Sequence, residues 1–258
     1  MLLQDKVAVV SGVGPGLGKE IALALVREGA SVVMGARTES YLKEVVAEIE
    51  SGGGQAAYAA TDITDVEQCR RLVRTAVDRF GRVDALVNNA FAPDAFQLFE
   101  DVDLDKWRHI FDVNVFGSLQ LTQEVIGPMK AQGGGSIVFI NSMVIRKILP
   151  NQGGYAASKG ALMTAAQVLA KELGPHHIRV NSVVPGWMWG ASVEGWFHHR
   201  AKKGPSVQEQ YDAVAKDIPL GLIPPDRDCA NAVVFFVSDL ATVVTGQALD
   251  VNGGEVFH

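Results

Sequence analysis

The sequence predicts an α/β fold, a doubly wound parallel sheet of about seven strands that forms a single domain over residues 1–258. Two observations predict this fold. Short apolar runs alternate with helical segments along almost the whole chain, and a glycine-rich turn links the first apolar run to the first helical segment. This alternation favours parallel strands whose connecting helices cover both faces of one sheet.

The first half of the chain contains apolar, β-branched runs that are typical of buried strands, and a helical segment follows each of the first three. Gly29, Gly52 and Gly81 mark the ends of these helices, as expected of helix-terminating glycines. The predicted strands are 6–11, 31–36, 56–60 and 85–88, and the predicted helices are 17–28, 40–50 and 65–80.

The second half continues the alternation, with 104–129 expected as one long helix. The remaining predicted strands are 136–141, 178–183 and 248–251, and the remaining predicted helices are 155–173 and 228–238. Residues 187–225 form the exception, an irregular stretch rich in Trp, His, Gly and Pro. A long loop inside a compact domain is usually functional, and we expect this one to be a mobile lid over a substrate.

Composition excludes several classes of protein. The 258 residues are 48% hydrophobic and 20% charged, which suits a globular chain with a sizeable core. The net charge of −6 argues against nucleic acid or an anionic membrane as partner. No apolar run reaches the ~20 residues of a membrane span, and the N-terminus lacks the pattern of a secretory signal. Two cysteines form no disulfide framework, so we expect a cytoplasmic protein.

The glycine-rich turn Gly12-Val-Gly-Pro-Gly-Leu-Gly18 follows the first strand and opens the first helix. Glycines at this position let the backbone approach a pyrophosphate, whose charge is received by the N–H groups of the helix. We therefore expect a Rossmann-type dinucleotide site. Its predicted residues here are Gly12, Gly14, Gly16, Leu17 and Gly18.

The end of the second strand indicates which dinucleotide binds. An acidic residue is expected about 20 residues after the glycine turn to bind the ribose 2′-hydroxyl, yet Arg37 stands there and no carboxylate occurs before Glu39. An arginine at this place can pair with a 2′-phosphate, which favours NADP(H). The alternative is that Arg37 stacks on adenine or is solvated, and NAD(H) then stays possible.

Tyr155 and Lys159 are the strongest candidates for chemistry. Their i, i+4 spacing places them on one face of the predicted helix. An ammonium beside the hydroxyl favours the phenolate of a tyrosine whose pKa is ordinarily near ~10, and this makes the phenol a usable acid or base. The pair alone is weak evidence, because Tyr and Lys at this spacing are common on ordinary helices.

Together with these residues, several further motifs make the chain resemble the short-chain dehydrogenase/reductase family over almost its whole length. The motifs are the turn Ser11–Gly18, the run Asn88-Asn89-Ala90 with Phe91 in place of glycine, Ser142 placed 13 residues before Tyr155, Pro185-Gly186, and Val251-Asn252-Gly253-Gly254. The resemblance implies hydride transfer between a nicotinamide cofactor and a ketone or secondary alcohol.

The resemblance also implies a role for each matching residue. Tyr155 exchanges the proton with the substrate oxygen, Ser142 holds that oxygen, Lys159 lowers the tyrosine pKa and binds ribose, and Asn114 holds a water that relays protons. The further cofactor contacts that it implies are Asp62, Ile63, Asn89, Ala90, Pro185, Gly186 and Met188. The family often has a Thr a few residues past Pro-Gly that bonds the nicotinamide carboxamide. Here no Thr or Ser follows Pro185-Gly186 before Ser192, so we expect the Met188 backbone to anchor the carboxamide.

The irregular stretch supplies the substrate expectation. Trp187, Trp189 and Trp196 are expected to contact the substrate together with Ser142 and Tyr155, because ligand pockets favour aromatic walls. An apolar, ring-bearing ketone or alcohol fits this wall. Glu194 with His198 hints at a metal, but no third ligand accompanies them, so no metal is expected.

Three hypotheses therefore remain in competition. The first is an NADP(H)-dependent carbonyl reductase, the second an NAD(H)-dependent secondary alcohol dehydrogenase, and the third a non-catalytic dinucleotide-sensing protein, which the intact Ser-Tyr-Lys set disfavours. The resemblance and the long apolar helices predict a homo-oligomer, a tetramer.

Overall fold

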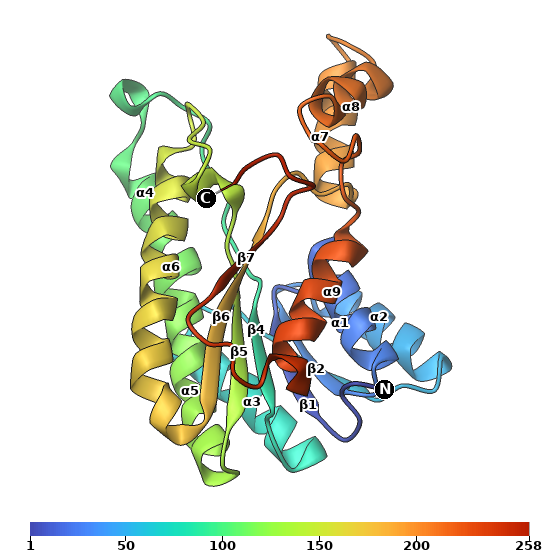
Figure 1. Cartoon of the computed structure of the whole chain (residues 1–258), viewed down its shortest axis with the longest axis vertical. Coiled ribbons are helices and arrows are strands. Elements are labelled where there is room, and N and C mark those ends of the chain that lie inside the picture. The colour runs from blue at the N-terminus through green and yellow to red at the C-terminus, as the bar shows by residue number, and fades with distance from the viewer. Residues whose placement is uncertain (258) are drawn as a thin grey trace.

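Seven parallel strands form one sheet in the computed structural model, which describes residues 1–257 (Figure 1). The strands are β1 (Val7–Ser11), β2 (Ser31–Ala36), β3 (Ala56–Ala60), β4 (Ala85–Asn88), β5 (Gly135–Ile140), β6 (Ile178–Pro185) and β7 (Ala248–Val251). Their order is β3-β2-β1-β4-β5-β6-β7, and every pair is parallel. The predicted fold class is confirmed. The strand order reverses between β1 and β4, and ligands of open α/β sheets bind at the carboxyl ends beside such a point.

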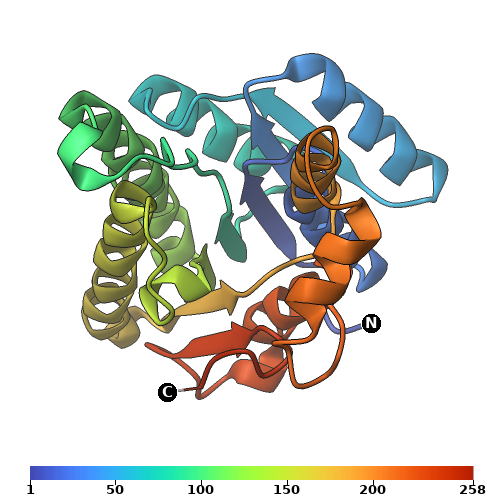
Figure 2. The same cartoon turned by 90° about the horizontal axis from the view of Figure 1, so that it is seen from above.

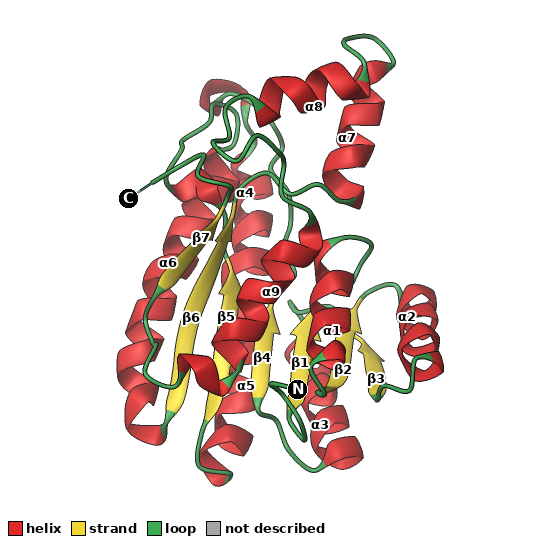
Figure 3. Ribbon diagram, turned by 45° about the vertical axis from the view of Figure 1, so that its right-hand side comes forward, coloured by secondary structure: helices red, strands yellow, loops and turns green. Residues whose placement is uncertain are grey.

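Helices cover both faces of the sheet (Figures 1 and 3). The helices on one face are α1 (Leu17–Arg27), α2 (Glu39–Ser51) and α9 (Asp226–Val237), and those on the other are α3 (Val66–Phe80), α5 (Ser118–Ala131) and α6 (Gly153–Leu173). Successive residues of a strand enter opposite cores: Val138 packs with the α1 side and Phe139 with the α3 side. Because both faces are covered, the strands are continuous apolar runs.

The segment expected as one helix over 104–129 is interrupted. It consists of α4 (Leu104–Phe111), a π-helical turn over Asp112–Gly117, and α5. Inside the π-turn the side chain of Asn114 is fully buried and accepts a hydrogen bond from the backbone N–H of Ala92, at 2.7 Å. This bond joins distant parts of the chain, so apolar periodicity within the helix carries no sign of it.

Residues 187–225 differ from the expectation of an irregular stretch, because they contain α7 (Ala191–Ala201) and α8 (Val207–Ala215). The two helices stand above the carboxyl ends of the strands, as Figure 3 shows and as Figure 2 shows from above. Phe197, Ala215, Ile218 and Ile223 form a small core of their own. Gly195 and the short length of both helices leave too little periodicity for a sequence prediction.

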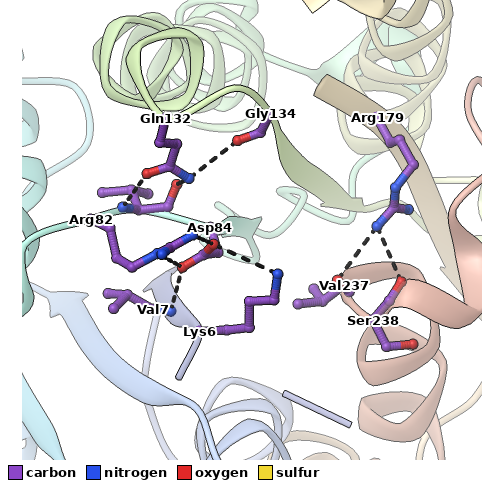
Figure 4. A network of polar contacts seen from close by, with 10 residues as sticks. Lys6, Val7, Arg82, Asp84, Gln132, Gly134, Arg179, Val237 and Ser238 are labelled. Atoms are coloured by element: carbon purple, nitrogen blue, oxygen red, sulfur yellow. Dashed lines mark hydrogen bonds and ion pairs between the residues drawn. The ribbon is translucent and has the colours of Figure 1, made fainter. Parts of the chain in front are cut away.

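The amino ends of the strands carry a polar network that holds the sheet to its surroundings (Figure 4). The carboxylate of Asp84 accepts hydrogen bonds from the backbone of Val7 at 2.8 Å and from the guanidinium of Arg82 at 2.6 Å. Arg179 donates to the carbonyl of Phe236 at 2.6 Å, near the end of α9. Several of these groups line a cavity of about 450 Å³. Most of their hydrogen-bonding capacity is used within the network, so we assign them a structural role. Among the described residues, no helix is long and apolar enough to cross a membrane.

Candidate active site

Three connected cavities form a groove at the carboxyl ends of the strands. The first, of about 570 Å³, extends from the glycine turn to Arg37, and the second, of about 320 Å³, reaches from the same turn to Tyr155. The third, of about 440 Å³, lies under the lid. Phe91 lines all three, so its replacement of a glycine places a ring at the centre of the groove.

The glycine turn is shaped for close contact with a ligand. A Cβ on Gly12 would lie 2.4 Å from the Cα of Ala90, and one on Gly18 would lie 2.3 Å from the carbonyl oxygen of Gly12. Asn89 fixes the turn, because its side chain donates to the Gly12 carbonyl at 2.8 Å. No side chain caps α1 at Gly16, so no side chain competes for the N–H groups of Leu17 and Gly18, which line the groove.

The far end of the first cavity brings together Arg37, Asp62 and Ile63, the residues expected around the adenosine. Hydrogen bonds from Thr64, followed by the charge of Arg37, lower the pKa of Asp62. The Glu39 carboxylate accepts from Tyr58 at 3.2 Å and pairs with Lys43 at 3.0 Å. Its carboxylate is therefore occupied on α2.

The second cavity collects the proposed catalytic set. Ser142, at the end of β5, and Tyr155 and Lys159, on α6, all line it. The Lys159 ammonium donates to the carbonyl of Ile140 at 2.6 Å and lies 5.6 Å from the centre of the Tyr155 ring. Tyr155 is hydrogen-bonded to Ser142. The helical spacing of Tyr155 and Lys159 and the family resemblance of Ser142 had led us to expect the three residues at one site.

The electrostatics of this set differ from expectation. Burial raises the pKa of Tyr155 to about 12, and its bond with Ser142 opposes that effect in part. Burial also lowers the pKa of Lys159 to about 7, which weakens the positive charge that was expected to favour the phenolate. Burial thus has the largest effect on both groups, and a lowering of the Tyr155 pKa by Lys159 stays a prediction.

Asn114 contacts the loop after β4 and the catalytic helix instead of Lys159. Its amide donates to Ser158 at 2.9 Å and to the Ala92 carbonyl at 3.3 Å, while its oxygen accepts from Ala92. These bonds occupy most of the side chain's capacity. The π-turn that carries Asn114 is a feature that often marks functional sites. A proton relay through Asn114 stays a prediction.

Comparisons with known proteins agree with this geometry. The family model described as "Enoyl-(Acyl carrier protein) reductase" matches residues 12–255. An uncharacterised oxidoreductase of Methylorubrum extorquens is 40% identical over 253 residues, which cover 98% of each chain. The chain belongs to the short-chain dehydrogenase/reductase family. It is therefore an NAD(P)-dependent oxidoreductase.

Two solved structures, of a dehydrogenase and a ketoreductase, resemble it closely. A 7α-hydroxysteroid dehydrogenase, complexed with NADH and 7-oxo glycochenodeoxycholic acid, superposes with a TM-score of 0.89 at 34% identity and covers 99% of this chain and 96% of its own. An F189W variant of actinorhodin polyketide ketoreductase with NADPH gives 0.91 at 32% identity, with 99% of each chain covered. Relatives thus bind either nicotinamide dinucleotide.

The residues present fit such a cofactor, which this family uses to give or take a hydride. Gly12 and Gly18 lie too close to neighbouring backbone for a Cβ, and the uncapped start of α1 offers N–H groups to a pyrophosphate. Pro185, Gly186 and Met188 line the cavity beside Tyr155, where the nicotinamide end is expected. Gly186 is required there, since a Cβ would lie 2.6 Å from that of Asn252.

The third cavity separates the predicted substrate residues. Trp187 and Trp196 line it, with their rings stacked at 5.8 Å between centroids. Trp189 does not line it, because its ring packs on Tyr211 and Phe197 in the core of the lid. The described residues contain no cluster of His, Cys, Asp or Glu that fits a metal, and Glu194 and His198 form none.

Two carboxylates of the site were missed by the sequence reasoning. Asp94 accepts hydrogen bonds from the backbone N–H groups of Tyr155 at 2.7 Å and Phe96 at 3.3 Å. Asp226 lines the second cavity from the start of α9. Neither stands in a motif, and each becomes part of the site only through packing of distant segments.

Proposed function

We propose that the protein interconverts a neutral, apolar, ring-bearing ketone and its secondary alcohol with a preference for NADP(H). The observation that supports this most strongly is the composition of the third cavity, with Ser142 and Tyr155 in its wall. Its other lining residues are Phe91, Pro93, Asp94, Phe96, Met143, Val144, Leu149, Gln152, Gly186, Trp187, Ser192, Val193 and Trp196.

That lining favours neutral substrates. It holds four aromatic rings besides Tyr155 but no Lys, Arg or His that would pair with a substrate carboxylate or phosphate. Its one carboxylate, Asp94, already accepts two backbone hydrogen bonds. The ring system of the 7-oxo glycochenodeoxycholic acid bound by the related 7α-hydroxysteroid dehydrogenase supports a ring-bearing ligand as the class to test first. The acid group of that ligand distinguishes it from the neutral class proposed here.

In this proposal the protein's residues handle the proton. Ser142 and Tyr155 hold the substrate oxygen between them, and the phenol, kept protonated by burial, donates its proton during reduction. Lys159, whose pKa is lowered to about 7, exchanges protons with its surroundings near neutral pH and restores the phenol. The apolar walls exclude water from the reacting carbon.

The preference for NADP(H) rests on Arg37. It lines the adenosine end of the groove just before α2, and Glu39, the first carboxylate after it in the sequence, is engaged by Tyr58 and Lys43. Quenching of tryptophan fluorescence should give tighter binding of NADPH than of NADH. Arg37→Asp should weaken NADPH binding by about 1–3 kcal/mol, the scale of a lost charge-assisted bond.

Arg74→Asp is the matched control, because Arg74 is an exposed arginine on α3 that does not line the cavity. It should leave the affinity for NADPH almost unchanged. Equal affinity of the unmutated protein for NADPH and NADH would support the NAD(H)-dependent dehydrogenase instead.

A ketone screen tests the substrate class. With the preferred reduced cofactor, fused-ring ketones such as a tetralone or an oxosteroid should give higher kcat/KM than acetone or a charged 2-oxo acid. Faster turnover of the charged acid than of every neutral ring ketone would contradict the proposed substrate class.

A further inference from the structure

Asp226 is a buried carboxylate that the family motifs leave without a role. It is the first residue of α9 and only 9% exposed, and it lines the same cavity as Tyr155, Lys159 and Met188. Backbone bonds join its segment to the one that follows β6: Trp189 donates to the Pro224 carbonyl at 2.7 Å, and Asp226 donates to the Trp189 carbonyl at 3.4 Å.

The carboxylate fills a space left by a missing side chain. A Cβ built on Gly190 would lie 1.8 Å from Oδ2 of Asp226, so no residue larger than glycine fits at 190 while Asp226 holds this position. A Cβ on Gly16 of the glycine turn would lie 3.2 Å from the same oxygen. Asp226 thus lies between the glycine turn and the segment after Pro185-Gly186.

No group of the protein satisfies this carboxylate. Within residues 1–257, no donor lies at hydrogen-bonding distance from its side-chain oxygens, and the charged groups that act on it most, Glu20 of α1 and Glu194 of α7, are both acidic. The side chain borders the cavity, so a donor within the cavity can reach its oxygens. A donor supplied by a ligand explains why the group is kept there.

We propose that Asp226 accepts a hydrogen bond from the carboxamide N–H of the nicotinamide, in place of a hydroxyl side chain at position 190. The chain has no Thr or Ser between Gly186 and Ser192 for this contact. Of the cofactor parts expected in this cavity, the carboxamide and the ribose hydroxyls provide donors, whereas the pyrophosphate provides only acceptors and negative charge. The ribose is expected on Lys159, so the carboxamide is the donor left for an ionised carboxylate, which is an acceptor only.

The state of the group agrees with this assignment. Burial, followed by the charges of Glu20 and Glu194, raises the pKa of Asp226 to about 6, so that the carboxylate is still ionised at pH 7.5. The inference rests on the nicotinamide cofactor common to the family and is independent of the proposed substrate and of the NADP(H) preference.

Calorimetric titration of Asp226→Ala tests the contact without turnover. The probes are the preferred oxidised dinucleotide and the matching ADP-ribose, with or without the 2′-phosphate, which keeps the pyrophosphate but lacks nicotinamide. We expect the dinucleotide to bind about tenfold more weakly, the effect of one charge-assisted bond, while ADP-ribose changes less than threefold. Asp228→Ala, an exposed acidic residue in the same first turn, should change neither.

Equal changes for both probes would overturn the proposal. Tighter binding of both would show that Asp226 acts by repelling the pyrophosphate, and weaker binding of both would show that it only shapes the cavity. If the unmutated protein reduces no ring ketone while Asp226→Ala weakens binding of the dinucleotide alone, the result counts against the proposed substrate and not against the contact.

An exchange of side chains provides the second test. Gly190→Thr alone should bind the dinucleotide poorly, because the new Cβ meets Asp226, whereas Gly190→Thr combined with Asp226→Ala returns a hydroxyl to the same space. We expect the double variant to recover affinity to within about threefold of the unmutated protein. Affinity no better than that of Asp226→Ala, with unchanged thermal stability, would contradict the exchange. Where Asp226→Ala does not fold, Asp226→Asn with the same two probes replaces it, and a loss confined to the dinucleotide again supports the contact.

Discussion

At the scale of single residues, the site is governed by burial. Tyr155 and Lys159 both lie where the charged form is disfavoured, and this raises the pKa of the phenol to about 12 and lowers the pKa of the ammonium to about 7. A protonated phenol is suited to donate to a carbonyl oxygen, and a lysine near its pKa at neutral pH is suited to pass protons.

Tyr155→Phe keeps the ring and removes the proton. We expect kcat to fall at least about 100-fold, the usual scale of lost general acid catalysis, while the dissociation constant of the cofactor stays nearly unchanged. Steady-state kinetics and fluorescence titration measure the two quantities. Turnover within a few-fold of the unmutated protein would exclude Tyr155 as the proton donor.

Asp226 should make stability depend on pH. Its pKa is raised from 3.8 to about 6, so the protonated carboxyl is favoured in the folded state. Its contribution to the free energy of unfolding is therefore complete below pH 3.8 and is lost as the group ionises when pH rises through 6. Asp226→Asn should therefore increase the free energy of unfolding at pH 8 by about 1–2 kcal/mol, after allowance for screening at the cavity mouth. Urea denaturation without cofactor should show the gain at pH 8 and little of it near pH 4. A gain of equal size at both values would contradict the ionisation.

At the scale of elements, two contacts between distant segments shape the site. The Asp94 carboxylate caps the first turn of α6 at Tyr155 and also holds Phe96, whose φ of 55° lies in the left-handed region. The lid carries its own core, in which Trp189 packs on Tyr211, whereas Trp196 lines the substrate cavity and stacks against Trp187.

Asp94→Ala should remove a helix cap provided by another segment. We expect the free energy of unfolding to fall by about 1 kcal/mol, the typical value of such a cap, and Asp94→Asn to recover part of it. Urea denaturation checks both variants. Unchanged stability in Asp94→Ala would mean that water replaces the carboxylate without loss.

The tryptophans of the lid should separate into two classes. Trp196→Ala should raise KM for a bulky ring ketone more than for a small ketone, because it removes a wall of the cavity. Trp189→Ala should instead lower the melting temperature, because its ring is part of the lid core. KM for two ketones of different size and thermal melts measure this contrast. Unchanged size selectivity in Trp196→Ala would remove the main support for an apolar substrate.

At the scale of the whole molecule, apolar residues remain exposed on α4, the π-turn and α6. Leu104 of α4, Phe116 of the π-turn and Val168 of α6 are each about half exposed. A second copy of the chain would cover such residues, which agrees with the expected homotetramer.

Light scattering at micromolar concentration should give the mass of a tetramer. Phe116→Glu should reduce that mass, whereas Val243→Glu, at a fully exposed position beside the amino ends of the strands, should not. A monomeric mass for the unmutated protein would refute the assembly.

Local patterns in the sequence determined the sheet, most helices and the main chemistry. Apolar runs of strand length that alternate with helices bounded by glycines specify a parallel sheet. A spacing of four residues puts Tyr155 and Lys159 on the same face of one helix, where both line the same cavity. Such features depend on neighbours along the chain. They are therefore visible in the order of residues alone.

The tertiary structure decided the rest. The π-turn at Asn114, the separation of Trp189 from Trp196, and the meeting of Asp226 with Gly190 each depend on contacts between segments far apart in sequence. The pKa values of Tyr155 and Lys159 depend on how completely the surrounding segments exclude water, which spacing along a helix does not encode. Packing of distant segments thus set the charge states and the cavity walls, whereas the sequence had already determined which elements would carry them.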